Sequence, residues 1–195
     1  MRNCGIYKKR QDKAKKFLML ILIFLVVFCF GVKKTEEALV DISPRLIILP
    51  PIDGLEWEDT VDIAATVKMI KKKFGRIIIL VSKEHGVQPK IIIAIVVVES
   101  GGDPNAVSEK GAYGLMQLKK GTARDMGIAD PFHPYDNLWA GTKYLKQQLK
   151  RFGSLALALA AYNMGPARLE RRIKNGFNPD YNIYIRRVET VLLYM

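Results

Sequence analysis

Apolar residues recur at three- and four-residue spacing through the second half of the chain, a pattern that predicts amphipathic helices. The helices expected there cover residues 137–152, 155–164, 166–175 and 179–195. Asn137 and Ser154 suit the N-caps of the first two, and Pro166 and Pro179 suit the first turns of the other two. A glycine follows each of the first three. Short helices joined by short loops are typical of a compact α-helical domain.

Upstream of these helices the pattern is less decisive. Residues 59–74 show a helical period that ends at Gly75, and two runs rich in β-branched residues follow, residues 77–81 and 91–98. Propensity by itself predicts strands for both runs. Pro89 in a first turn, together with the length of the second run, favours a helix instead. The residues alone leave strand and helix open for 91–98.

The N-terminal segment has the order basic, apolar, basic. Residues 1–16 hold seven Lys or Arg and one Asp, and residues 17–32 carry no charge. A helix of that length spans about 24 Å, slightly less than the ~30 Å hydrocarbon core, and flanking lysines extend its reach. We interpret 17–32 as an uncleaved transmembrane anchor, with 1–16 in the cytoplasm and the remainder on the periplasmic side. A cleaved signal sequence, which would release the protein to the periplasm, is the alternative.

The remaining chain divides into a linker and a domain. Proline and Asp-Gly pairs punctuate residues 33–58, which we predict to be a linker, so the folded domain covers residues 59–195. The formal net charge is +12, and half of this excess lies in residues 1–16. The other half suits an anionic polymer in general.

Cysteine and histidine usage gives little support to a metal site. Both cysteines, Cys4 and Cys29, precede the predicted domain, so no disulfide framework is expected within it. His85 and His133 are isolated, and we expect them at the surface or in loops. No metal and no cofactor is predicted.

Glu99 is the first candidate for chemistry. It ends an apolar run and is followed by Ser100, Gly101 and Gly102. At the end of a buried helix, desolvation and the negative end of the helix dipole would both raise the pKa of its carboxyl. A general acid at neutral pH needs such a pKa. A solvated glutamate at a helix terminus is the alternative on these residues alone.

Further motifs follow Glu99 at compatible spacing. They are Ala106-Val107-Ser108, Gly114-Leu115-Met116-Gln117, Asp136-Asn137, Ala161-Tyr162-Asn163 and Tyr184-Ile185-Arg186-Arg187-Val188. Each motif is weak by itself, but the ordered set resembles the catalytic domain of the soluble lytic transglycosylases, which has the goose-type lysozyme fold. The resemblance runs from about residue 77 to residue 191. It implies an all-α, predominantly helical domain of the α+β lysozyme-like superfamily, in which residues 77–81 and 91–98 are both helical.

The resemblance implies that the chain acts on peptidoglycan glycan strands. Glu99 would be a single acid and base that cleaves between N-acetylmuramic acid and N-acetylglucosamine, with help from the substrate's own N-acetyl group. The product would end in 1,6-anhydromuramic acid. Most glycosidases use two carboxylates. None of the other acids matches a position that the family uses as a nucleophile; these are Asp103, Glu109, Asp125, Asp130 and Asp136.

Substrate-binding roles are also implied by the resemblance. The residues concerned are Ser108, Met116, Gln117, Tyr162, Asn163 and Tyr184. Ser108 would lie near the N-acetyl group, although a turn serine is an equally good reading of the residue alone. Met116 and Gln117 would line the cleft wall. Tyr162 would face Glu99.

Two further expectations concern the same cleft. Tyr184 is a second candidate hydroxyl, and Asn163 would serve the fold near the cleft. Lys119 and Lys120 stand where the family usually has Met-Pro, so they replace an apolar contact and add a cation facing an anionic glycan.

Other functions remain as alternatives. A lysozyme-type hydrolase would need a second carboxylate, and Asp103 is the acid nearest to Glu99 in sequence. A non-catalytic peptidoglycan-binding scaffold is the alternative from another class. Nucleic-acid binding is not expected, because it leaves the motifs unexplained. The small size suits local wall opening beside a secretion or conjugation machine, and general wall turnover stays open.

Overall fold

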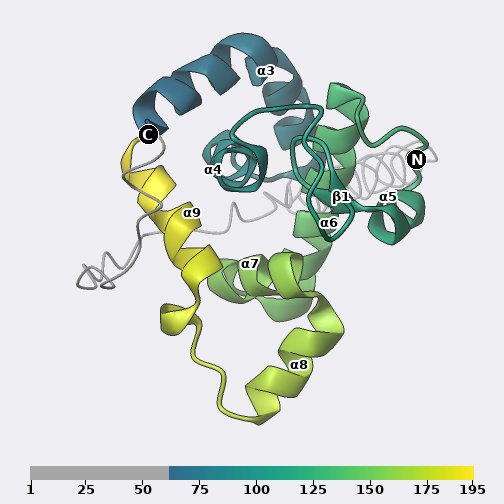
Figure 1. Ribbon diagram of the computed structural model, residues 1–195. Coiled ribbons are helices and arrows are strands. Elements are labelled where there is room, and N and C mark those ends of the chain that lie inside the picture. The colour runs from purple at the N-terminus through teal and green to yellow at the C-terminus, as the bar shows by residue number, and fades with distance from the viewer. Residues whose placement is uncertain (1–61) are drawn as a thin grey trace, which may run out of the picture. The chain divides into compact units, whose positions relative to one another are not determined.

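The structure is a computed structural model that describes residues 62–195, and the predictions for residues 1–58 lie outside this range. The described chain is mostly helical, as predicted (Figure 1). Its elements, in order, are α3 (Ile63–His85), α4 (Pro89–Ser100), β1 (Ala112–Tyr113), β2 (Leu118–Lys119), α5 (Lys120–Met126), α6 (Pro134–Phe152), α7 (Leu155–Met164), α8 (Pro166–Lys174), the 3-10 helix η1 (Pro179–Tyr181) and α9 (Ile183–Leu193).

Helix α4 lies at the centre of the fold. It packs against α3 on one side and α9 on the other, and Figure 1 shows it nearly end-on among the other helices. Residues 91–97 are all buried, as expected for a helix that is apolar on every face. The helical interpretation of 91–98 is therefore confirmed. Pro89 stands in the first turn, and Gly101 ends the helix with a φ of 60° that favours glycine.

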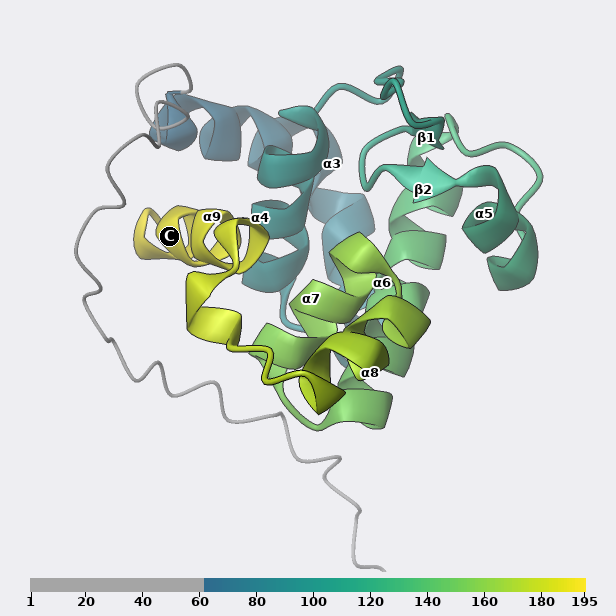
Figure 2. The same cartoon turned by 60° about the horizontal axis from the view of Figure 1, so that its bottom comes forward.

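The other helices pack against one another in succession around α4. Helix α3 contacts α6, α6 contacts α7, and α7 contacts both α8 and α9. In Figure 2, α8 lies in front of α7, and the hairpin of β1 and β2 lies beside α5. The hairpin is antiparallel and pairs Ala112 with Lys119 and Tyr113 with Leu118. The turn between its two strands, residues 114–117, includes residues predicted for the cleft and lies close to the C-terminal end of α4.

Two predicted helix starts are wrong. Helix α6 begins at Pro134 rather than at Asn137, whose side chain is fully buried and bonds a neighbouring loop instead of capping the helix. Pro179 opens a short 3-10 turn, and α9 begins after Asn182, whose side chain accepts a hydrogen bond from the Ile185 amide. Proline fixes φ for any first turn, so it does not by itself specify an α-helix.

Gly75 does not stop a helix. Helix α3 passes through it and ends at Gly86, where φ is 63°. A β-carbon added at Gly75 would meet nothing within 4 Å. Glycine in a helix interior costs backbone entropy that alanine does not.

We therefore expect Gly75→Ala to stabilise the domain by about 0.5–1 kcal/mol, which for a chain of this size raises Tm by about 2 °C. Gly86→Ala is the matched control, because φ at this position disfavours any β-carbon, and it should lower Tm. Thermal unfolding followed by circular dichroism measures both. A Tm for Gly75→Ala below that of wild type would contradict the continuous helix.

The two histidines differ in their surroundings. His133 is exposed at the start of α6 and lies 3.4 Å from the Asp136 carboxylate, in agreement with a surface position. His85 is half-buried at the end of α3, where its ring meets Trp139 edge-on at 5.2 Å. It is therefore a packing residue rather than a loop histidine. Burial lowers its pKa.

The described residues contain neither a candidate membrane-spanning helix nor a candidate metal-binding cluster. Within 62–195 there is no helix of sufficient length and apolarity to cross a bilayer. The same residues hold no group of three or more His, Cys, Asp or Glu side chains arranged to bind a metal ion.

Candidate active site

Glu99 lies in the last turn of α4, where the buried helix meets the loop before β1. The next residue fixes this junction: the Ser100 hydroxyl donates to the Leu115 carbonyl at 2.9 Å and accepts from the Gly102 amide at 3.1 Å. The end of α4 is thereby tied to residues 114–117, which form the turn between β1 and β2. This role of Ser100 was not anticipated from the sequence.

The Glu99 carboxyl accepts a hydrogen bond from the Tyr184 hydroxyl at 2.7 Å. Tyr184 belongs to the first turn of α9, which packs on α4. Burial raises the pKa of Glu99 from 4.5 to about 7, although the hydrogen bond from Tyr184 acts in the opposite direction. A carboxyl with a pKa near neutral pH can both donate and accept a proton.

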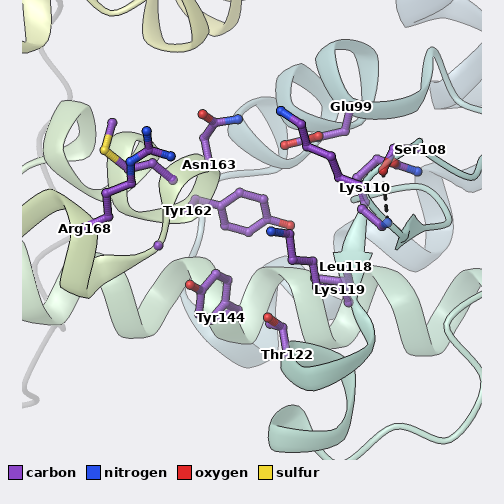
Figure 3. Close-up of a pocket in the computed structure, with 14 residues that line it drawn as sticks. Glu99, Ser108, Lys110, Leu118, Lys119, Thr122, Tyr144, Tyr162, Asn163 and Arg168 are labelled. Atoms are coloured by element: carbon purple, nitrogen blue, oxygen red, sulfur yellow. Dashed lines mark hydrogen bonds between the residues drawn. The ribbon is translucent and has the colours of Figure 1, made fainter.

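A pocket of about 450 Å³ opens in front of Glu99 (Figure 3). This volume is typical of sites for small ligands or for a few units of a polymer. Most of the residues that line it have polar side chains, although polar and apolar atoms contribute about equally to its surface. The side chains around it are Glu99, Ser108, Lys110, Gln117, Lys119, Thr122, Tyr144, Tyr162, Asn163, Met164 and Arg168, with Ala112, Leu118 and Gly165.

Ser108 and Gln117 both line the pocket, as expected. The Ser108 hydroxyl accepts from the Ala112 amide at 3.0 Å, so it serves the turn as well as facing the pocket. The Gln117 side-chain nitrogen donates to the carbonyls of Ala106 and Gly114, which leaves its side-chain oxygen to accept from a ligand. Gln117 also has a φ of 48°, a left-handed conformation that costs a non-glycine residue about 1–2 kcal/mol.

Met116 does not line the pocket. Its side chain is fully buried, and a β-carbon at Gly141 would collide with it. The expectation of an apolar cleft wall at Met116 is therefore wrong. The reason is the turn geometry, which points this side chain toward α6 while neighbouring Gln117 faces the pocket.

Tyr162 lines the pocket but its hydroxyl does not contact Glu99. It donates to the Met116 carbonyl at 2.8 Å, while the tyrosine that bonds the acid is Tyr184. Burial, followed by the nearby Glu99 charge, raises the pKa of both tyrosines well above the ordinary value. Both hydroxyls therefore remain donors at neutral pH. Tyr184, which the sequence analysis gave as the second candidate after Tyr162, is therefore the tyrosine that contacts Glu99.

Asn137 organises the site from outside the pocket. Its side-chain oxygen accepts from the Met116 amide at 2.7 Å, and its nitrogen donates to the carbonyls of Tyr113 and Pro131 at 2.9 and 2.7 Å. One buried side chain on α6 thus holds both sides of the hairpin turn. Asn163, predicted near the cleft, is exposed and lines the pocket.

The sequence-based prediction missed most of the cations. Lys110, Lys119 and Arg168 all line the pocket, and Lys119 alone of these was singled out in advance. Lys120, its neighbour, begins α5 and does not line the pocket. No sequence motif marks Lys110 or Arg168, because nothing local to either residue indicates which cavity it faces.

Glu99 is the sole carboxyl among the described residues that line the pocket. Asp103, the acid nearest in sequence, accepts a hydrogen bond from the Asn105 amide in an exposed turn. The other acids considered from the sequence, Glu109, Asp125, Asp130 and Asp136, are likewise absent from the lining.

Comparison with known proteins identifies the family of the chain. A family model, the transglycosylase SLT domain, matches residues 76–185, more than half of the chain. The chain belongs to this family. The match covers Glu99, the hairpin, the pocket and Tyr184.

Two curated relatives each match part of the chain. A transglycosylase of Enterobacteria phage PRD1 is 36% identical over 84 residues, which are 43% of this chain and 32% of that protein. Membrane-bound lytic murein transglycosylase F of Desulfosudis oleivorans is 37% identical over 121 residues, 58% of this chain and 27% of that protein. The chain thus spans about a third or less of the length of these relatives.

Solved structures share the fold. An inactive mutant of the lytic transglycosylase Slt from Pseudomonas aeruginosa has a TM-score of 0.54 and 30% identity, covering 64% of this chain and 24% of that one. The 70 kDa soluble lytic transglycosylase from Escherichia coli has a TM-score of 0.57 at 24% identity, covering 68% and 27%. The helical SLT domain is therefore the part in common.

Proposed function

We propose that the chain is a peptidoglycan lytic transglycosylase that cleaves the β-1,4 bond between N-acetylmuramic acid and N-acetylglucosamine. The observation that carries this proposal is Glu99, the one carboxyl of the described pocket lining, desolvated and hydrogen-bonded by Tyr184. Membership of the SLT family supports the reaction class. The names of the relatives support the substrate.

In the first step, protonated Glu99 gives its proton to the glycosidic oxygen. The bond from that oxygen to the anomeric carbon breaks, and the N-acetylglucosamine side leaves as an alcohol. The carbonyl oxygen of the muramyl N-acetyl group forms a bond to the anomeric carbon in its place. Glu99 becomes a carboxylate, which the Tyr184 hydroxyl stabilises through its hydrogen bond.

In the second step, the Glu99 carboxylate takes the proton of the muramyl 6-hydroxyl. The 6-oxygen bonds to the anomeric carbon, and the N-acetyl oxygen leaves it. The product is a 1,6-anhydromuramyl end, Glu99 is protonated again, and no water is consumed. A carboxyl with a pKa of about 7 suits both steps, because the same group must act as acid and then as base.

The presence of one carboxyl in the described pocket lining favours this route over a hydrolysis that uses two carboxylates. An inverting hydrolase needs a second carboxylate to activate water, and a retaining hydrolase needs one as nucleophile. The described pocket lining offers neither. Ser108 and Gln117 both line the pocket, which supports the proposal that they bind the N-acetyl group and ring hydroxyls.

Product analysis tests the proposal. Purified sacculi are digested with the full chain, and the soluble muropeptides are identified by mass spectrometry. The expected products carry 1,6-anhydromuramic acid, which is lighter than the reducing product by one water. Reducing ends alone would assign a lysozyme-type hydrolase, and binding to sacculi without soluble fragments would assign a scaffold.

Replacing Tyr184 removes the hydroxyl that contacts Glu99 and should reduce activity without abolishing it. We expect Tyr184→Phe to lower kcat by about 10- to 100-fold, because a hydrogen bond to a charged group contributes about 1.5–3 kcal/mol. That hydrogen bond lowers the pKa of Glu99, so its loss raises this pKa and moves the alkaline limb of the pH–rate profile to higher pH. Tyr194→Phe, at the exposed end of the same helix, is the matched control. An unchanged alkaline limb in Tyr184→Phe would contradict the assigned contact.

We further propose that residues 17–32 anchor the protein in the cytoplasmic membrane with the domain on the periplasmic side. The apolar run with its basic flank supports this, as does the membrane-bound name of relatives. Sequencing the N-terminus of the mature protein tests it. An intact residue 1 in the membrane fraction is expected, whereas a new N-terminus after residue 32 would indicate a cleaved signal.

A further inference from the structure

Three cations surround the pocket from different parts of the fold. Lys110 lies in the loop before β1, Lys119 lies on β2, and Arg168 lies on α8. Figure 3 shows Lys110 and Lys119 on the hairpin side of Tyr162 and Arg168 on the opposite side. All three side chains are exposed, so their charged ends remain accessible to a ligand. We call these three residues the cationic rim.

The charges of the cationic rim are not neutralised within the part of the chain that the structure describes. Ion pairs there join Arg124 to Asp125 and Arg151 to Glu170, and none includes a rim residue. Glu170 is the acidic residue on the same helix as Arg168, so it is the nearest candidate in sequence to neutralise that arginine. Its carboxylate oxygen lies 2.6 Å from an Arg151 guanidinium nitrogen instead.

No ion pair among the described residues joins the cationic rim to Glu99. Burial raises the pKa of Glu99, and the hydrogen bond from Tyr184 lowers it. A cation close to a carboxyl would lower its pKa, and a general acid at neutral pH has no use for that effect. Because all three side chains line the pocket, their positive charge faces the space that a ligand would occupy.

A glycan of N-acetylated sugars has neutral rings, and three unpaired cations contribute little to binding it. Muramyl residues also carry a 3-O-lactyl group. Its carboxyl is free in bare strands and is extended by a carboxylate-bearing peptide in substituted strands. An anionic group of this kind would relieve the repulsion among the rim cations and pair with them.

We propose that Lys110, Lys119 and Arg168 bind carboxylates on the 3-O-lactyl substituent of the muramyl residue, so that the site selects charged over neutral glycan. This inference rests on the proposed function for its substrate. Exposed ion pairs are individually weak, and each is expected to change affinity about twofold to fivefold. Acting together, three should give a preference of about tenfold or more for the charged substrate.

The test uses four forms of purified glycan strands. Peptide-bearing strands are compared with the same strands after their carboxyls have been converted to primary amides. Strands freed of peptide by an amidase, which carry lactyl carboxylates, are compared with their own amidated form. Binding to the full chain with Glu99→Gln gives Kd without cleavage, and kcat/KM is measured with Glu99 intact.

A rim variant joins Lys110→Gln, Lys119→Gln and Arg168→Gln. Its matched control joins Lys71→Gln, Lys72→Gln and Arg76→Gln, which remove the same charge from exposed positions of α3 outside the pocket. Wild type and the control should bind carboxylate strands about tenfold more tightly than amidated strands. The rim variant should lose this preference while binding amidated strands as wild type does. Added salt should weaken binding of carboxylate strands more in wild type than in the rim variant.

The outcomes distinguish peptide carboxylates from lactyl carboxylates as the bound group. They also distinguish a failure of the rim proposal from a failure of the proposed function. A preference confined to peptide-bearing strands assigns the peptide carboxylates, and one confined to bare strands assigns the lactyl carboxylate; either supports the rim. Equal Kd values for charged and amidated strands in wild type would overturn it, as would the same loss of preference in the α3 control. Absence of anhydro products from every substrate would refute the proposed function, and the Kd comparison would still decide the role of the rim.

Discussion

Glu99→Gln should lower kcat on peptidoglycan by about 10²- to 10⁴-fold, the range expected for loss of a general acid and base. Glutamine keeps the size of the side chain and can still accept from Tyr184, but it cannot donate a proton to the glycosidic oxygen. Release of soluble muropeptides over time measures the effect. Full activity in this variant would remove Glu99 from the mechanism.

The control for Glu99→Gln is Asp103→Asn. Asp103 lies four residues away in an exposed turn and does not line the pocket. Its neutralisation should leave kcat within about twofold of wild type, since surface substitutions change free energies by about 0.5 kcal/mol or less. A large loss in Asp103→Asn would favour a second catalytic carboxyl and hence the hydrolase.

The pKa of Glu99 also links stability to pH. Its folded-state value of about 7 lies above the ordinary 4.5, so the protonated form is favoured in the folded state. Its contribution to stability is full below pH 4.5 and is lost as the pH rises through 7. A shift of this size corresponds to about 3 kcal/mol. Urea unfolding at pH 5 and pH 8 should show this loss in wild type and not in Glu99→Gln.

Asn137→Ala should destabilise the domain by about 3–5 kcal/mol, the largest effect on folding that we expect from a single side chain. Asn137 is fully buried and makes three hydrogen bonds to the backbone around the hairpin. Its removal leaves the Met116 amide and two carbonyls without their partner. The midpoint of urea unfolding measures the change, with the slope m as a check for two-state behaviour.

The matched control for Asn137→Ala is Gln147→Ala. Gln147 is an exposed amide on the same helix, so its replacement should change stability by no more than about 0.5 kcal/mol. The turn held by Asn137 also carries Gln117 and the carbonyl that accepts from Tyr162. Any folded Asn137→Ala protein should therefore lose substrate affinity as well. Equal stability of the two variants would show that the network around Asn137 contributes little.

Much of the helical pattern was predictable because helix ends are local. Ser154 caps α7 and Gly153 ends α6, as their positions next to apolar periods indicated. The failures at Asn137 and Pro179 have a different cause. At both positions a residue that suits a helix start was used by the fold for another purpose: a buried hydrogen-bond network in one case and a 3-10 turn in the other.

Helix α4 shows that intrinsic β-strand propensity does not decide the conformation of a fully buried segment. Residues 91–97 are β-branched except for Ala94, and intrinsic preference would make them a strand. Burial on all faces decides otherwise, because a helix satisfies its own backbone hydrogen bonds inside an apolar core. The resemblance to a known family gave the correct answer, whereas the residues alone did not.

By itself the sequence made Glu99 a candidate, since an apolar run ending in a carboxyl and glycines is a local feature, and the resemblance to a known family implied its role as the acid. Its surroundings were decided by tertiary structure. Tyr184, 85 residues further on, reaches the carboxyl because α9 packs on α4, while the hydroxyl of Tyr162 is taken by a carbonyl. The Met116 side chain lies in the core, whereas the side chains of Lys110 and Arg168 line the pocket. These directions depend on how distant helices pack, and no pattern within a few residues of each side chain contains that information.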